Sequence, residues 1–376
     1  MTHAFDPAVL GRTLALAGDA VGLSDPNPRV ACVLASPDGR VLAEGHTQRA
    51  GSAHAEVMAL AAAGDTARGT TAYVTLEPCS HHGRTPPCCD ALVQAGIARV
   101  VVALQDPNPL VAGRGLARLR AAGVKVTLLP PDHPAAVASR ELNIGFFSRM
   151  LRRRPWVRMK VAASLDGRTA LDDGRSRWIT GEAARTDGHA WRKRAGAVLT
   201  GIGTVLDDDP RLDVRLVPTE LQPKRVVVDS RLEIPLAARI LQPPGEVLVY
   251  TAAALDAPAV ADKRRALAEL GVTVVARPGP GGKVDLGAVL DDLAAREVNE
   301  LHVEAGHKLN GSFVREGLVD EFLVYLAPRL LGQGREMARF GPLGALDDAP
   351  ALAYQSVERV GDDLRILARP PGRADF

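Results

Sequence analysis

Short apolar runs alternate with longer alanine- and leucine-rich runs along almost the whole chain. In the first 150 residues, the short apolar runs bounded by turn residues predict strands, and the alanine-rich runs predict helices. The predicted strands are 30–35, 41–44, 71–76, 99–104 and 124–128. The predicted helices are an amphipathic one through Leu10, Leu14, Ala17 and Val21, followed by 55–63, 91–95, 115–122 and 135–147. Alternation of this kind is typical of an α/β fold.

The sequence Arg152-Arg153-Arg154-Pro155 interrupts this pattern. A charged run that ends in proline is typical of a solvated connector or of the entry to a new strand. We therefore expect two domains, one at residues 1–150 and one at 155–370. The strands predicted in the second domain are 157–163, 197–201, 225–229, 246–251, 272–276, 300–304 and 321–326.

The overall composition is that of an ordinary globular protein, with 376 residues, 46% hydrophobic and 24% charged. A net charge of +2 is too balanced for a protein held mainly by nucleic acid or by an anionic membrane. The longest stretch without a charged residue, 195–206, is shorter than the roughly 20 apolar residues of a spanning helix. The first 22 residues lack a basic segment ahead of an apolar core, so we expect no signal peptide and a cytoplasmic protein.

Three of the four cysteines, Cys79, Cys88 and Cys89, fall within eleven positions. In a reducing compartment such a cluster indicates metal binding or catalysis rather than a disulfide framework. His54 opens a predicted helix, Cys79 follows a predicted strand, and Cys88 begins the next helical stretch. One imidazole and two thiolates suit Zn²⁺ and leave a fourth position open to water, as in catalytic zinc sites.

The sequence His54-Ala55-Glu56 places Glu56 where it can move protons rather than bind metal. Zinc-dependent base deaminases combine H-x-E with P-C-x-x-C. Here the P-C pair is present, but eight residues separate Cys79 from Cys88, which departs from the short form. An alternative pair, Cys79 with His82, would leave Cys88 without a role.

The remaining features of this region have simpler interpretations. The inserted segment 80–87 is polar and rich in turn residues, so it is a candidate phosphate- or sugar-binding loop beside the metal. Cys32 lies in an apolar strand and is expected in the core. Cys89 adjoins a ligand, so it is either a spare thiol or a further ligand.

Residues 77–88, together with the H-A-E sequence, resemble the deaminase domain of the bifunctional riboflavin-biosynthesis deaminase–reductase. In that family the long Cys-x8-Cys spacing is the rule. Three other segments match the family: 26–30, 105–109 and 113–115. Ala31 stands where the family usually has glycine.

The resemblance implies a cytidine-deaminase-like α/β/α domain at the N-terminus. By position, zinc would be held by His54, Cys79 and Cys88, and Glu56 would be the proton donor and acceptor. The early loop 26–30 would contact substrate through Asn27.

The second domain carries weaker signals of its own. Gly201-Ile202-Gly203-Thr204 follows a strand, but it is not G-x-G-x-x-G, so the Rossmann fingerprint is absent. The strand at 301–304 leads into a glycine-containing turn and a helix at 305–312. The backbone N–H groups of such a turn could hold a phosphate, or the turn could be an ordinary strand-to-helix connection.

The second domain also resembles the reductase domain of the same family. The matching segments are 160–170, 178–181, 201–206, 208–210, 228–230, 304–306 and 327–332. The family's reductase has a dihydrofolate-reductase-like α/β fold and uses NADPH, which explains the missing Rossmann fingerprint.

The resemblance assigns contacts in this domain by position. NADPH would be contacted by Ala162, Trp178, Thr204, Asp208, Ser230 and the turn formed by Gly306, His307, Lys308, Leu309, Asn310, Gly311 and Ser312. His307 stands at a variable position of that turn and has no role of its own. The substrate would be contacted by Ser176, Arg192, Leu212, Arg215 and Glu304. The two arginines suit a 5′-phosphate, and Glu304 suits ribose hydroxyls or an amine.

The implied function is two consecutive steps of riboflavin biosynthesis on a small phosphorylated pyrimidine. The first domain would deaminate 2,5-diamino-6-(5-phosphoribosylamino)pyrimidin-4(3H)-one. The second would use NADPH to reduce the ribosyl group, giving 5-amino-6-(5-phosphoribitylamino)uracil. The family often associates through its reductase domain, which makes a homo-oligomer possible.

Three alternatives remain open at this point. A nucleic-acid editing deaminase would need a basic groove with aromatic side chains, which the +2 charge and 4% aromatic content disfavour. A non-catalytic nucleotide-binding module stabilised by zinc would not need Glu56. A chain with one active and one inactive domain would keep only one of the two activities.

Overall fold

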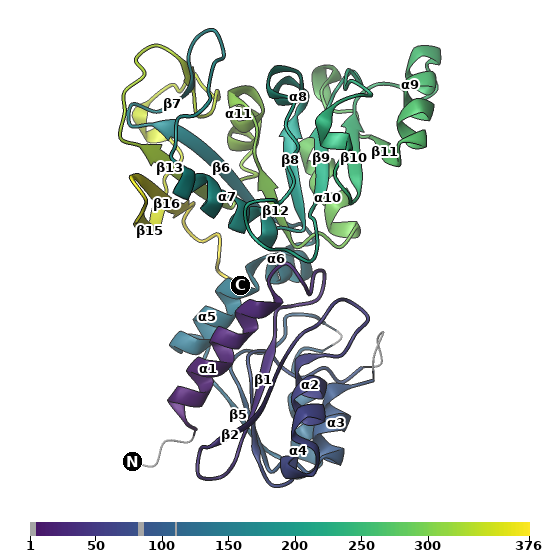
Figure 1. The fold of residues 1–376 in the computed structure, drawn as a ribbon, viewed down its shortest axis with the longest axis vertical. Helices are drawn as coiled ribbons and strands as arrows, with labels where there is room; N and C mark the ends of the chain where they lie inside the picture. The colour runs from purple at the N-terminus through teal and green to yellow at the C-terminus, as the bar shows by residue number, and fades with distance from the viewer. Residues whose placement is uncertain (1–4, 82–85, 110) are drawn as a thin grey trace. The chain divides into compact units, whose positions relative to one another are not determined.

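The computed structural model describes residues 5–81, 86–109 and 111–376, and it divides into two compact units (Figure 1). The first unit contains the chain as far as Arg153 together with Phe376, and the second contains Arg154–Asp375. Arg153, with a positive φ of 58°, ends the last helix of the first unit. Each unit has its own sheet and its own core.

A five-stranded sheet with the order β2-β1-β3-β4-β5 forms the centre of the first unit. Its strands are β1 (Ala31–Ala35), β2 (Val41–His46), β3 (Thr71–Val74), β4 (Arg99–Val102) and β5 (Lys125–Leu128). β1 runs antiparallel to β2 and β3, whereas β3, β4 and β5 are parallel. All five strands lie where the apolar runs predicted them.

Helices cover both faces of this sheet (Figure 1). They are α1 (Pro7–Ala17), α2 (Ala55–Ala63), α3 (Cys88–Gln94), α4 (Arg114–Ala121), α5 (Pro134–Leu142) and α6 (Ile144–Arg152). Alternate residues of β1 point to opposite faces, as in any strand. Cys32 and Leu34 pack with α2, α3 and α4, and Val33 packs with α1 and α5. The three layers are those predicted for this domain.

The continuous helix predicted at 135–147 is wrong at Asn143, where the structure breaks it into α5 and α6. The buried Asn143 side chain accepts the backbone N–H of Arg29 at 2.7 Å and donates to the Arg29 carbonyl at 3.0 Å. These two bonds satisfy the backbone of a segment 114 residues away. They also explain why a residue with low helix propensity lies between two helices.

A nine-stranded sheet with the order β11-β10-β9-β8-β12-β6-β13-β16-β15 forms the second unit. Its strands are β6 (Trp156–Ser164), β8 (Ala197–Gly201), β9 (Lys224–Val228), β10 (Val247–Thr251), β11 (Val272–Ala276), β12 (Glu300–Val303), β13 (Glu321–Ala327), β15 (Ala353–Val360) and β16 (Asp363–Arg369). The seven strands from β11 to β13 are parallel, and β16 and β15 are antiparallel. A second small sheet pairs β7 (Arg168–Ala170) with β14 (Arg335–Glu336).

The antiparallel strands β15 and β16 were absent from the strands predicted by the sequence. Most of β15 is exposed, and it carries Tyr354, Glu358 and Arg359 rather than a continuous apolar run. Tertiary pairing along β16 therefore fixes this strand, because its own sequence pattern is weak.

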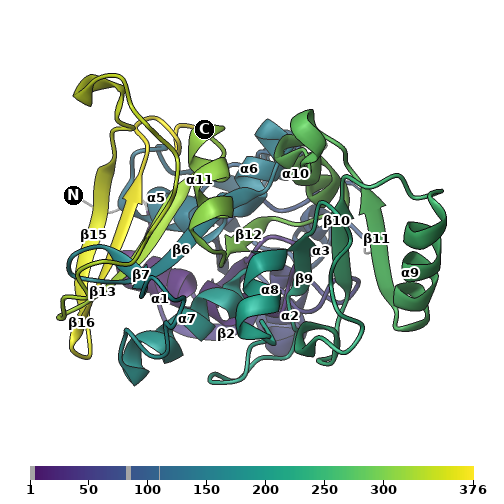
Figure 2. The same ribbon diagram turned by 90° about the horizontal axis from the view of Figure 1, so that it is seen from above.

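Helices also cover both faces of the second sheet (Figure 2). They are α7 (Glu182–Arg194), α8 (Ile202–Asp208), α9 (Pro258–Glu269), α10 (Leu286–Ala295) and α11 (His307–Arg315). α10 and α11 share one core with Leu199 of β8. α8 and α9 share another core with Val198, the next residue of the same strand. The predicted α/β class therefore holds for both units.

Within the described part of the chain, no helix combines the length and the apolar character needed to cross a membrane.

Gly45 of β2 allows α2 to approach the sheet closely. A Cβ at this position would lie 2.5 Å from the Ala55 carbonyl oxygen and 2.6 Å from the Ala59 nitrogen. We expect Gly45→Ala to lower the free energy of unfolding of the first unit by roughly 1–3 kcal/mol. Gly11→Ala in α1, where nothing lies within 4 Å, is the matched control and should be neutral or slightly stabilising. Urea unfolding of both variants measures this, and equal stabilities would contradict the close approach.

Candidate active sites

The three predicted zinc ligands converge from three different segments of the first unit. His54 is the N-cap of α2, Cys88 is the first residue of α3, and Cys79 lies in the loop after β3. Their ligand atoms all lie within 4.8 Å of one another. His54 Nδ1 is 3.3 Å from Cys88 Sγ and 3.7 Å from Cys79 Sγ. Residues 34 positions apart in sequence therefore meet at one point.

The electrostatics of this group fit a divalent cation. Hydrogen bonds from Cys88, opposed by burial and helped by His54, lower the pKa of Cys79 to about 4. The pKa of Cys88 is raised because it faces the Cys79 sulfur and is buried. A cation at this point would stabilise both thiolates, and one imidazole with two thiolates is a donor set that Zn²⁺ prefers.

Glu56 lies in the first turn of α2 with 3% of its surface exposed. Burial, and after it the negative charge of Cys79, raises the pKa of its carboxyl group. A carboxyl group with a raised pKa beside a metal site is suited to exchange protons near neutral pH.

The other two cysteines of this unit lie in the core. Cys89 is fully buried, and its Sγ donates to the carbonyls of Pro78 at 3.2 Å and Gly115 at 3.5 Å. Burial raises the pKa of Cys89 to about 12, so it remains a thiol. Its contacts explain it as a packing residue, outside the His-Cys-Cys group. Cys32 is part of the same core cluster, as predicted.

Sequence reasoning missed Glu77, which lies two residues before Cys79. Its carboxylate is 4% exposed and accepts four backbone N–H groups. The donors are Gly113 and Gly115 at 2.9 Å, Leu116 at 3.2 Å and Asp106 at 3.3 Å. The carboxylate thus holds the start of α4 and the segment after β4 beside the zinc ligands. The signal available in the sequence was an acid placed between a predicted strand and a predicted ligand.

Two other predicted parts of this site have limited structural support. Asn27 lies in a turn closed by its N–H bond to the Ser24 carbonyl at 2.9 Å, and its substrate contact stays a prediction. Of the proposed loop at 80–87, residues 82–85, including His82, lie outside the described residues.

The predicted cofactor residues of the second unit lie near the carboxyl ends of neighbouring parallel strands. Ala162 is in β6, Thr204 is in the first turn of α8 after β8, Ser230 follows β9, and Gly306 follows β12. Ligands of open α/β sheets bind outside these strand ends, where the strand order changes direction. Here the order changes at β12, which lies between β8 and β6.

The starts of α8 and α11 come close together at this edge. A Cβ on Gly306, the N-cap of α11, would lie 3.7 Å from Thr204 Oγ1. Two neighbouring helix N-termini offer free backbone N–H groups to a diphosphate. The residues present therefore fit a dinucleotide at this position.

Three residues of the predicted Gly306–Ser312 turn also pack against the protein, and their cofactor contacts stay predictions. Asn310 is buried and donates to the Met337 carbonyl at 3.0 Å. A Cβ on Gly311 would lie 1.8 Å from the Arg339 carbonyl oxygen, and Leu309 packs against the core. These three residues pack the turn against the core and against the segment that contains Met337 and Arg339.

The remaining cofactor residues keep their predicted roles as expectations. Lys308 is exposed and Ser312 is half-buried on α11. The backbone carbonyl of His307 accepts the Arg339 N–H at 2.8 Å, and Asp208 ends α8. Trp178 is 62% exposed, with the Arg185 guanidinium 4.8 Å above its ring.

Two predicted substrate residues, Arg192 of α7 and Glu304 after β12, bind each other. Arg192 pairs through Nε and Nη2 with both carboxylate oxygens, and Lys160 Nζ lies 3.7 Å from Glu304. Burial opposes ionisation of Glu304, but Arg192 and Lys160 hold its pKa well below the ordinary value. A third Arg192 nitrogen, Nη1, donates to the Asp213 carbonyl at 3.0 Å.

The other predicted substrate residues lie in two loops. Leu212 is buried with a positive φ of 51°, and the half-exposed Arg215 pairs with Asp213 at 2.8 Å. Ser176 is half-buried in the loop after β7.

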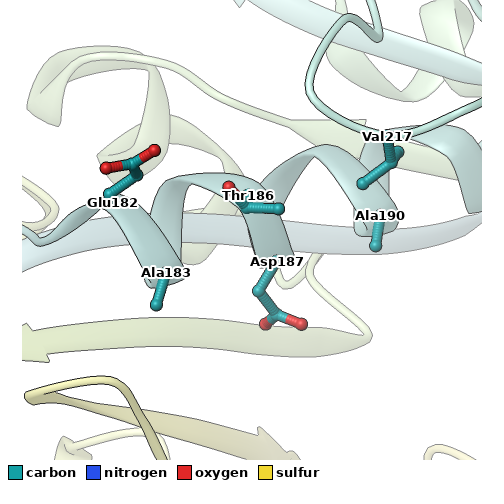
Figure 3. Close-up of a pocket in the computed structure, with 6 residues that line it drawn as sticks. All are labelled: Glu182, Ala183, Thr186, Asp187, Ala190 and Val217. Carbon is teal, nitrogen blue, oxygen red and sulfur yellow. The ribbon is translucent and has the colours of Figure 1, made fainter.

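A further pocket lies along α7 (Figure 3). Its lining is Glu182, Ala183, Thr186, Asp187, Ala190 and Val217. None of these six residues is a predicted site residue, and Asp187 is already bonded to Tyr325 and Arg365.

Two family models match the chain along most of its length. The cytidine and deoxycytidylate deaminase zinc-binding region matches residues 6–104, and the RibD C-terminal domain matches residues 155–366. With the His-Cys-Cys group, these matches define a zinc-dependent deaminase joined to a reductase.

Full-length relatives narrow this class to one family. The riboflavin biosynthesis protein RibD of Escherichia coli strain K12 is 43% identical, with 96% of this chain and 98% of the relative covered. RibD of Aquifex aeolicus is 39% identical, covering 98% and 99%. The structure of Acinetobacter baumannii RibD matches with a TM-score of 0.86 at 40% identity, covering 96% and 97%. The chain belongs to the RibD family.

This result confirms the family and the fold predicted from the sequence. The first unit is the cytidine-deaminase-like domain, and the second is the dihydrofolate-reductase-like domain. The protein is a bifunctional riboflavin-biosynthesis enzyme, a deaminase that uses zinc and a reductase of the type that uses NADPH. The nucleic-acid editing and non-catalytic alternatives are not favoured.

The ligand assignment predicts different results for two adjacent cysteines. Cys88→Ala should reduce bound zinc from one equivalent to about a tenth or less, because two ligands remain. Cys89→Ala should keep full zinc and lose only stability, since its sulfur packs in the core. Elemental analysis of the two purified proteins measures this. Stoichiometric zinc in Cys88→Ala would show that the ligand set is different.

Proposed function

We propose that residues 1–150 deaminate 2,5-diamino-6-(5-phosphoribosylamino)pyrimidin-4(3H)-one and that residues 155–370 reduce the ribosyl group of the product with NADPH. The observation that carries the proposal is the meeting of His54, Cys79 and Cys88 beside the buried Glu56. Full-length similarity to RibD proteins supports the same two activities in one chain.

In the deaminase, Glu56 exchanges the protons. It accepts a proton from the water that attacks the ring carbon bearing the 2-amino group, and it delivers a proton to the departing ammonia. Its raised pKa allows both transfers near neutral pH. Zinc, when bound to His54, Cys79 and Cys88, lowers the pKa of water and so supplies a nucleophile.

The Glu77 carboxylate keeps this arrangement rigid. It fixes the loop that carries Cys79 against the start of α4, so the ligands and Glu56 do not need to reorganise during the reaction. Buried groups with satisfied hydrogen bonds are well suited to this supporting role.

In the reductase, NADPH supplies the hydride for C1′ of the opened ribosyl group. Thr204, Ser230 and the start of α11 would hold the cofactor at the carboxyl ends of the strands. Glu304, fixed as a carboxylate by Arg192, would bind ribose hydroxyls or the amine. Arg215, with a 45% exposed side chain, is the more accessible arginine for the 5′-phosphate.

The proposal also covers the partners of the enzyme and its location in the cell. Its partner is a small phosphorylated pyrimidine, and association of copies through the reductase domain stays a prediction from the family. The expected cytoplasmic location is also part of the proposal.

Glu56→Gln tests the two activities on one protein. The variant should lose ammonia release from the diaminopyrimidine by at least about 100-fold, because the amide cannot exchange protons. NADPH oxidation with supplied 5-amino-6-(5-phosphoribosylamino)uracil should stay at the wild-type rate, and bound zinc should stay stoichiometric. Loss of both activities would contradict separate sites, and loss of neither would contradict the proton-transfer role of Glu56. A wild-type protein lacking one activity would identify an inactive domain.

A further inference from the structure

Residues 211–215 carry two predicted substrate contacts, and other side chains hold their backbone on two sides. On one side, Gln222 accepts the Val214 N–H at 2.8 Å and donates to the Val214 carbonyl at 2.9 Å. On the other, Arg192 donates to the Asp213 carbonyl at 3.0 Å. Leu212 takes a left-handed φ of 51°, which is rare for a branched residue and persists only where neighbours impose it.

His189 completes the second side. It lies on α7 and is 4% exposed, and its Nδ1 accepts the backbone N–H of Arg215 at 3.1 Å. Its Nε2 lies 3.4 Å from Nη1 of Arg192, the guanidinium that holds Glu304. A single imidazole therefore contacts the backbone of one predicted substrate residue and the side chain of another.

The surroundings keep this imidazole neutral. Burial, and then the charges of Arg192 and Arg215, lower the pKa of His189 to about 4. A neutral ring has one nitrogen that accepts and one that donates. Since Nδ1 accepts from Arg215, Nε2 carries the proton. The approach of Nε2 to Nη1 of Arg192 is then a packing contact between two donors, and Arg192 is tied to the segment by its own bond to the Asp213 carbonyl. His189 thus acts as a fixed hydrogen-bond acceptor. The neutral ring does not repel the two arginines, and it transfers no proton to or from the substrate.

We infer that His189 is a positioning residue of the reductase, which fixes the backbone of Arg215 in the 211–215 segment, while Arg192 holds the same segment through the Asp213 carbonyl. In this arrangement Arg215 and Arg192 meet the phosphorylated sugar together. The inference rests on the proposed reductase function. It concerns binding of the sugar substrate. The predicted NADPH residues lie on α8, on α11, at the ends of other strands and, for Trp178, in the loop before α7, and none of them lies in the 211–215 segment.

Two substitutions separate this role from simple packing. In His189→Asn, the side-chain oxygen can occupy the place of Nδ1 and accept the Arg215 N–H. In His189→Gln, the longer side chain puts its amide near the place of Nε2. The measurement is steady-state NADPH oxidation with 5-amino-6-(5-phosphoribosylamino)uracil. Ammonia release by the same protein reports correct folding of the deaminase unit, and the KM for NADPH reports that of the reductase unit.

His189→Gln should raise the KM for the sugar substrate by about tenfold, the size of one lost hydrogen bond, with the KM for NADPH within about twofold of wild type. His189→Asn should recover most of the affinity, with a KM within about threefold. Equal KM values in the two variants, or a parallel rise in the KM for NADPH, would overturn the positioning role.

Gln222→Ala provides a second test from the opposite side of the segment, should neither His189 variant fold. It removes both Val214 bonds and should raise the same KM without changing that for NADPH. An unchanged KM would show that the segment does not set substrate affinity, which overturns the inference. Wild-type protein that oxidises no NADPH with this substrate contradicts the proposed function instead, before any variant is compared.

Discussion

The zinc site depends on a carboxylate that binds no metal. Glu77 is buried, and an ionised group removed from water is costly unless its oxygens are fully bonded. Four backbone N–H groups, from the segment after β4 and from the first turn of α4, satisfy it. Gly115 makes this possible, since a Cβ there would lie 2.1 Å from the Pro78 carbonyl oxygen. The position of Cys79 therefore follows from the contact between the loop after β3 and the segment that leads from β4 into α4.

In the reductase unit, buried carboxylates are held by arginine side chains, whereas Glu77 of the first unit is held by backbone N–H groups. Glu300, His302 and Glu304 share the face of β12 that α7 covers, while Leu301 and Val303 point into the opposite core. Arg158 and Arg194 pair with Glu300, and Arg192 pairs with Glu304. Loss of one partner would leave the other charge buried and unpaired, which is costly, so these side chains have little freedom to move. Such rigidity suits the proposed role of this surface, which is to hold a flexible opened sugar.

The features that depend on short stretches of sequence could be predicted. The strand and helix alternation and the H-A-E and P-C motifs were sufficient for the fold class and for the convergence of His54 with Cys79 and Cys88. The helix break at Asn143 was not predictable because its partner, Arg29, is 114 residues away. The Arg192–Glu304 pair and the His189 contact also join distant segments, so no spacing reveals them. The largely exposed β15 has no apolar pattern to detect.

The placement of β12 between β8 and β6 has a consequence for how the chain acquires its structure. The sheet of the first unit needs only residues up to Leu128, so it can form while the rest is still being synthesised. In the second unit, β6 and β8 are complete by Gly201, but the strand that joins them begins at Glu300. Until that strand emerges, both carry open edges, which are the surfaces most prone to mispairing. The reductase unit is thus the slower and more vulnerable half during biosynthesis.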